Sequence, residues 1–143
     1  MFLGEYQHSV DEKGRIVMPA KFRERLEAGA VVTKGQERCL YVFPQDRWAD
    51  EVAKVSRLPR TNRRNRDYAR AFFGGASDLQ MDKQGRLPIP QPLRSFAGLD
   101  KDVVVVGVSD RLEIWDAVSW QSLSSQADEL YAGIEEALSE EGI

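Results

Sequence analysis

The sequence contains very little cysteine and histidine. Among its 143 residues there is one of each, Cys39 and His8. A single cysteine cannot form an internal disulfide, and the two residues together are too few for a structural zinc site, which needs four ligands. The sequence therefore predicts a protein without a metal site, and a reducing, cytoplasmic compartment is the default expectation.

Long apolar runs are also missing. The longest, Val103 to Val108, suits a buried strand and is far shorter than the roughly 20 residues of a membrane helix. The first residues include Glu5 and His8, and no basic segment followed by an apolar stretch marks a secretory signal. With 42% hydrophobic and 30% charged residues, the composition is that of a globular domain. We therefore expect no membrane association.

Catalytic motifs are the third absence. The sequence has no Walker A loop, no G-x-G-x-x-G and no H-E-x-x-H. Neither Cys39 nor any serine has an identifiable partner that would activate it as a nucleophile. We interpret Cys39 as a packing residue of an apolar strand and His8 as a strand residue without chemistry. The sequence predicts no catalytic residues and no cofactor, so we expect the protein not to be an enzyme.

Charge is unevenly distributed along the chain. The net charge is −3, but residues 1–75 carry fifteen Lys and Arg against ten Asp and Glu, whereas residues 76–143 carry five against thirteen. A basic block runs from Lys54 to Arg70 and contains Asp67 as its single acidic residue. The block, and its part from Arg57 to Arg70 above all, suits either DNA or the acidic half of a neighbouring subunit, and the sequence leaves both open.

The chain repeats itself. Residues 11–19 read D-E-K-G-R-I-V-M-P and residues 82–90 read D-K-Q-G-R-L-P-I-P, which share Asp, Gly, Arg and the last Pro at a spacing of 71. At a spacing of 72 the apolar residues also match: Leu40, Val42, Phe43 and Trp48 correspond to Leu112, Ile114, Trp115 and Trp120. The repeat predicts two related units that pack as pseudo-twofold halves.

Each repeat predicts a hairpin with a cationic tip. We expect strands at residues 2–10 and 15–18, joined by a three-residue loop whose Gly14 is left-handed. Asp11 and Arg15 would then oppose each other across the strands, and Lys13 would stand at the tip. Cations at such a tip have solvent or phosphate as partners. We therefore assign DNA contacts to Lys13, Arg15, Lys83 and Arg86, and a structural role to Asp11, Gly14, Asp82 and Gly85.

Further elements follow from proline, glycine and the apolar spacing. Short helices are expected after Pro19 and Pro90, ending at Gly29 and Gly98. Strands are expected at 30–34, 39–43, 102–108 and 112–115, helices from Pro44 and Asp116, and an acidic helix at 127–138. The predicted organisation is a first unit at 1–53, a basic helical connector at 54–75, a second unit at 76–124 and an acidic C-terminal helix at 125–143.

Four segments resemble one known family. They are the N-terminal M-F-L-G-E-Y, the D-E-K-G-R-I-x-x-P-A-K-F-R from Asp11, the second D-x-x-G-R-x-x-I-P, and the N-R-R-N-R-D-Y-A-R-A-F-F-G-G-A of residues 62–76. Together they resemble the MraZ family of bacterial transcriptional regulators, which contain two AbrB-like (SpoVT-AbrB) domains. The resemblance implies an α+β fold, a pseudo-twofold double swapped-hairpin β-barrel with flanking helices, in a ring-shaped homo-oligomer.

The resemblance also implies a DNA target, namely repeated sites upstream of the division and cell-wall gene cluster that includes the family's own gene. It places the DNA contacts at and around the motif from Asp11 to Arg15. We expect a smaller role for Arg86, because its half is acidic and Pro88 replaces Val17. The sequence thus predicts a nucleoid-associated regulator, with repression as the expected effect, that binds double-stranded DNA at direct repeats in its own promoter region.

Two other functions remain open at the level of sequence. The first is an oligomeric scaffold whose basic block binds an acidic protein partner without any DNA function. The second is an RNA-binding module, which the sequence favours least, because the aromatic residues do not align as a stacking platform on one strand.

Overall fold

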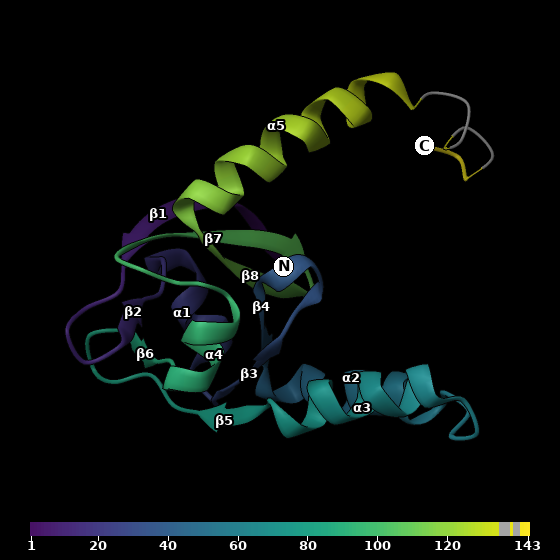
Figure 1. Ribbon diagram of the computed structural model, residues 1–143. Coiled ribbons are helices and arrows are strands. Elements are labelled where there is room, and N and C mark those ends of the chain that lie inside the picture. The colour runs from purple at the N-terminus through teal and green to yellow at the C-terminus, as the bar shows by residue number, and fades with distance from the viewer. Residues whose placement is uncertain (135–137, 139–140) are drawn as a thin grey trace.

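The protein combines an antiparallel β-sheet with flanking helices, which confirms the expected α+β class (Figure 1). The computed structural model describes residues 1–134, 138 and 141–143. Within these ranges no helix has both the length and the apolar character that crossing a membrane requires.

Apart from one 3-10 turn in the first half, the two halves contain the same succession of elements. The first has β1 (Phe2–Ser9), β2 (Arg15–Val17), α1 (Ala20–Leu26), β3 (Ala30–Lys34), the 3-10 turn η1 (Gln36–Arg38), β4 (Leu40–Pro44) and α2 (Gln45–Ser56). After α3 (Arg63–Gly74), the second has β5 (Ser77–Leu79), β6 (Arg86–Pro88), α4 (Gln91–Phe96), β7 (Asp102–Ser109), β8 (Arg111–Asp116) and α5 (Ala117–Gly133). The sequence prediction placed most of these elements to within one or two residues.

The halves exchange strands. The six-stranded sheet has the order β1-β7-β8-β4-β3-β5, so the first strand of each half pairs with the third strand of the other. When each strand is replaced by its counterpart, the same order results, read from the other edge of the sheet, as the predicted pseudo-twofold arrangement requires. β1 and β5 are the outer strands, and the described strands do not close into a barrel.

The predicted pairing of residues 2–10 with 15–18 is wrong. β1 pairs with β7 along its whole length, and β2 pairs with β6. A single bridge, Val10 to Ile16, joins the two segments that were expected to form a hairpin. The exchange places Ile16 opposite Leu87, and both side chains are fully buried. A hairpin local to one half would leave these apolar side chains without each other's cover.

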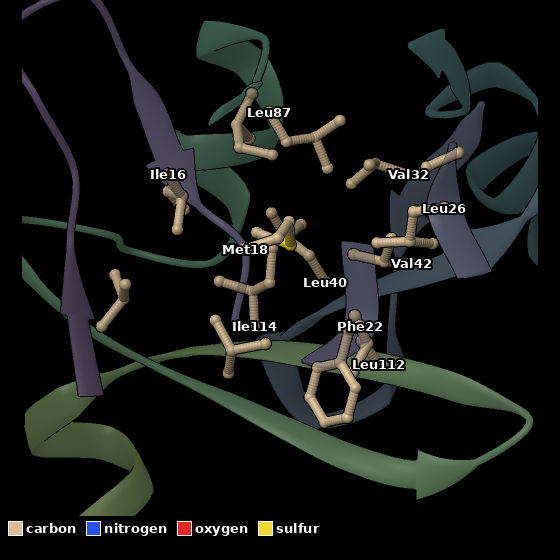
Figure 2. Packing of buried hydrophobic residues seen from close by; sticks show 14 of the residues in the cluster. Ile16, Met18, Phe22, Leu26, Val32, Leu40, Val42, Leu87, Leu112 and Ile114 are labelled. Atoms are coloured by element: carbon tan, nitrogen blue, oxygen red, sulfur yellow. The ribbon is translucent and has the colours of Figure 1, made fainter. Parts of the chain in front are cut away.

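One core lies between the halves. At its centre Leu40 pairs with Ile114 and Val42 with Leu112, and all four are 0% exposed. Met18, which follows β2, and Phe22 and Leu26 of α1 cover them (Figure 2). Because both halves contribute to this core, neither Asp–Arg motif can be positioned without the other half.

The helices α2 and α5 begin on the face of the sheet opposite this core. Phe43 of β4 contacts Trp48 of α2, with ring centroids 5.9 Å apart, and Trp115 of β8 contacts Trp120 of α5 at 5.6 Å. α3 then returns along α2 and buries Phe72 against this cluster. The helices predicted from Asp116 and at 127–138 are one continuous α5 up to Gly133, and the part predicted at 135–137 lies outside the described residues.

Candidate nucleic-acid interface

The first Asp–Arg loop, residues 11–15, is held closed by the Asp11 carboxylate. Its Oδ1 accepts hydrogen bonds from the backbone N–H groups of Lys13 and Arg15, both at 2.9 Å. Its Oδ2 lies 2.7 Å from Nε of Arg15. Gly14 has a φ of 77°, a left-handed conformation that favours glycine. The carboxylate therefore fixes both the loop backbone and the direction of the arginine.

The second loop, residues 82–86, has the same geometry. Oδ1 of Asp82 accepts from the N–H groups of Gln84 and Arg86 at 2.9 Å, and Oδ2 lies 2.6 Å from Nε of Arg86. Gly85 has a φ of 75°. The predicted turn and its left-handed glycine are thus confirmed in both repeats, although the ion pair closes a turn instead of linking two long strands.

These hydrogen bonds lower the pKa of both aspartates. The largest cause is the backbone N–H of Arg15 for Asp11 and that of Arg86 for Asp82. Desolvation acts in the opposite direction, and the arginine side chains lower the pKa further. A carboxylate that accepts several N–H bonds is most stable in its charged form. Both ion pairs are therefore complete at neutral pH.

Each loop is held by the other half of the chain. The Gly14 C=O accepts a hydrogen bond from the Ile89 N–H at 3.0 Å, and the Gly85 C=O accepts one from the Met18 N–H at 2.8 Å. The two bonds are equivalent under the pseudo-twofold relation. Because each crosses from one half to the other, the positions of the two loops are fixed relative to each other.

Two arginines that sequence reasoning did not single out complete this arrangement. Arg94 of α4 donates to the Ile89 C=O, and its guanidinium lies against Gly14. Arg23 of α1 donates to the Met18 C=O at 3.0 Å and lies against Gly85. The signal that would have found them is the repeat itself, since Arg23 and Arg94 are 71 residues apart, as the motifs are.

The arginines of the two loops share one face. In the β2–β6 pair, Arg15 is opposite Pro88 and Arg86 is opposite Val17, with the buried Ile16 and Leu87 between them. Since side chains alternate along a strand, Arg15 and Arg86 both point away from the core. Both loops lie at the end of the molecule beside β2 and β6 (Figure 1).

The lysines stand on the exposed part of each loop. Lys13 and Lys83 are both exposed, whereas the side chains of Arg15 and Arg86 are 25% and 30% exposed. The structure thus brings together the four cations that the sequence assigned to DNA: two lysines in solvent and two arginines on one face.

The basic block lies elsewhere. Its arginines on α3 are exposed: Arg63, Arg64, Arg66 and Arg70. The connection between α2 and α3 points away from the end that carries the two loops (Figure 1). The tip of the basic block is therefore separate from the two loops of the same chain.

The two residues considered for chemistry, Cys39 and His8, are not part of the two loops. Cys39 is buried, its Sγ donates to the Gln36 C=O at 3.2 Å, and burial raises the pKa of the thiol to about 12. Desolvation, with the nearby charge of Arg23, lowers the pKa of His8. The described part of the chain contains no group of His, Cys, Asp or Glu side chains suited to a metal ion.

Comparison with known proteins agrees with the repeat. The family model described as MraZ protein matches residues 1–71 and again residues 72–140. A protein named transcriptional regulator MraZ from Nocardioides sp. is 51% identical over 94% of both chains. Proteins of the same name from Acetivibrio thermocellus and Syntrophomonas wolfei are 46% and 47% identical over the full length of both chains. The chain belongs to the MraZ family.

Proposed function

We propose that this protein is a transcriptional regulator that binds specific sites in double-stranded DNA with its two Asp–Arg loops. The observation that supports this most is the common face of Arg15 and Arg86, flanked by Lys13 and Lys83. The relatives are named as transcriptional regulators, which agrees with the proposal.

The loops suit DNA because they are held in place before binding. Asp11 and Asp82 each engage Nε of their arginine, so the remaining N–H groups of the guanidinium point in a defined direction. A major groove about 12 Å wide admits a two-stranded turn, and an arginine there makes a bidentate contact with guanine. Lysine on the same loop suits a phosphate. We assign base reading to Arg15 and Arg86 and backbone contacts to Lys13 and Lys83.

The geometry supports comparable roles for the two loops, in contrast to the smaller role expected for Arg86 from the sequence. The second loop has the same internal hydrogen bonds as the first. Its central residues, Lys83 and Gln84, are more positive than Glu12 and Lys13. Apart from Asp82, which is paired with Arg86, the acidic residues of the second half therefore lie outside the loop that would approach DNA.

Assembly belongs to the same proposal. We propose a ring-shaped homo-oligomer built from swapped-hairpin units that binds direct repeats in its own promoter region, upstream of a division and cell-wall gene cluster, with the nucleoid as its location. Several loop pairs on one ring would gain from effective concentration when the sites are repeated. Repression is the expected effect.

The test is binding to duplex DNA from upstream of the protein's own gene, measured by fluorescence anisotropy at two salt concentrations. Arg15→Lys and Arg86→Lys keep the charge beside the aspartate but lose the bidentate fork. Each should lower specific affinity by about five- to 150-fold, the equivalent of about 1 to 3 kcal/mol for one guanine contact. Arg25→Lys, on α1 and paired with Asp46, is the matched control.

Lys13→Ala and Lys83→Ala separate phosphate contact from base reading. Each should weaken specific and non-specific DNA alike and lower the salt slope by about one for each loop engaged. If Arg15→Lys and Arg86→Lys leave the ratio of specific to non-specific affinity unchanged, bases are read elsewhere. If the native chain has no affinity for duplex DNA, the scaffold function becomes the better explanation.

A further inference from the structure

We propose that a groove on the α2–α3 arm binds the C-terminal helix α5 of a second copy of this chain. The arm is defined as α2, α3 and residues 57–62 between them. This inference rests on the proposed homo-oligomer and names the two surfaces that form its repeating contact.

The arm groove is apolar at its floor and cationic at its rim. It has a volume of about 360 Å³ and lies between the end of α2 and α3. Val55, Leu58 and Phe73 contribute apolar surface, and Phe73 is 36% exposed. The rim carries Arg60, Arg66 and Arg70, and among the described residues none that lines the groove has a carboxylate.

Neighbouring acids do not cancel this charge. Asp67 is shared between Arg70, at 3.1 Å, and Arg63, at 3.6 Å, and all three side chains are more than half exposed. Arg66 donates to the backbone C=O of Arg60 at 2.8 Å. The groove therefore keeps a positive excess, which suits an acidic partner with apolar side chains.

α5 offers both properties. The sequence contains no lysine or arginine after Arg111, and Asp128 and Glu129 lie near the end of the helix. In the same region Leu130 is 68% exposed, Tyr131 79% and Ile134 39%. Large apolar side chains exposed together on an acidic helix mark an interaction surface. This surface complements the arm groove in charge and in polarity.

The arm groove and the exposed end of α5 cannot meet within one chain, so the partner is another copy. α5 and the arm extend from opposite sides of the molecule (Figure 1). The base of α5 is fixed by contact of Trp120 with Trp115 and by a 3.3 Å hydrogen bond from Trp120 Nε1 to Glu5. A contact between unlike surfaces of identical chains repeats from copy to copy and closes into a ring when the rotation permits.

Paired charge reversal tests the contact on the full chain. The arm variant is Arg60→Glu with Arg70→Glu, and the tail variant is Asp128→Lys with Glu129→Lys. Lys21→Glu with Lys101→Glu, two exposed cations off the arm, matches the charge change of the arm variant. Light scattering at matched concentration gives the mass, and circular dichroism checks the fold. Each variant alone should fall from the native mass towards the 16.2 kDa monomer, whereas the control should not.

Mixing the two variants is the decisive step. In the mixture, each mutated groove meets a mutated tail and each native groove meets a native tail, so the large species should return. If both variants keep the native mass, or if mixing does not restore it, the proposed arm–tail contact is wrong, and a ring would have to be built from other contacts. A native chain that is itself a monomer removes the ring as well. Loop variants at Arg15 and Arg86 are read separately by DNA affinity, so the failure of either proposal is recognised on its own.

Discussion

The two halves of the molecule are nearly identical at the Asp–Arg loops and differ outside the sheet. Each loop has a left-handed glycine. The distance from the arginine Nε to the aspartate Oδ2 is 2.7 Å in the first loop and 2.6 Å in the second. On the opposite face, α2 is covered by α3, whereas α5 has no buried residue in its described length.

This difference separates structure that a short segment specifies from structure that needs contact between distant segments. Each loop is defined by five consecutive residues and one cross-half hydrogen bond, so a duplicated sequence reproduces it twice. The outer helices start alike, from Pro44 and Asp116 and from equivalent aromatic pairs. Only the first half continues into a segment with Phe72, which gives α2 an apolar partner.

The largest expected effect on stability comes from the contact between α2 and α3. Phe72→Ala should destabilise the protein by about 3 to 5 kcal/mol, because Phe72 is 4% exposed and its ring packs against Trp48 and Phe43. Leu130→Ala on α5 should change the stability of the isolated subunit by less than about 0.5 kcal/mol, because Leu130 is exposed. Denaturant titration of dilute protein measures both. Equal losses would show that α5 is covered within a single chain.

A smaller effect should be the same in both halves. Gly14→Val and Gly85→Val should each cost about 1 to 3 kcal/mol, because a β-branched residue is strained at these positive φ values. The new side chains would also displace Arg94 and Arg23, respectively. Gly74→Val, where the added atom meets nothing within 4 Å, is the control. A marked difference between the Gly14 and Gly85 variants in thermal unfolding would contradict the equivalence of the loops.

The arginines that hold the loops come next. Arg23→Met and Arg94→Met keep the aliphatic stem but remove the bond to the Met18 or Ile89 carbonyl. Each should lower stability by about 1 to 2 kcal/mol and reduce the affinity for DNA, because loss of a charged hydrogen bond loosens the loop of the other half. Hydrogen exchange of the Gly14 and Gly85 loops distinguishes them: Arg94→Met should affect the first and Arg23→Met the second. Faster exchange in the wrong loop would refute the cross-half support.

The smallest effect concerns acid. Asp11 and Asp82 have pKa values below that of a free aspartate, about 3.9. Their contribution to stability is therefore complete above that pH and is lost as the pH falls through the lowered folded-state values. Carboxylate NMR titration should give two similar, lowered midpoints. Asp11→Asn should remove only one of the two transitions, and a midpoint at or above 3.9 for either residue would contradict the ion-pair geometry.

Much of this structure was determined by sequence. Proline, glycine and apolar spacing predicted the helices after Pro19 and Pro90, the central strands and the left-handed Gly14 and Gly85, because these preferences act within a few residues. The repeat predicted the pseudo-twofold relation, because related sequences adopt related local structure. The spacing of the motifs likewise identified the cations that the structure gathers at one end.

Tertiary structure alone decided which strands pair and what the motif arginines face. A local pattern shows that Ile16 is to be buried, but it does not say that Leu87 of the other half covers it. The same limit hid the contacts that Arg23 and Arg94 make across the halves, since Arg23 lies against Gly85, 62 residues away, and Arg94 lies against Gly14, 80 residues away. Burial and hydrogen bonding are satisfied by the whole chain, so the exchange of strands and the common face of Arg15 and Arg86 emerge only when both halves share one core.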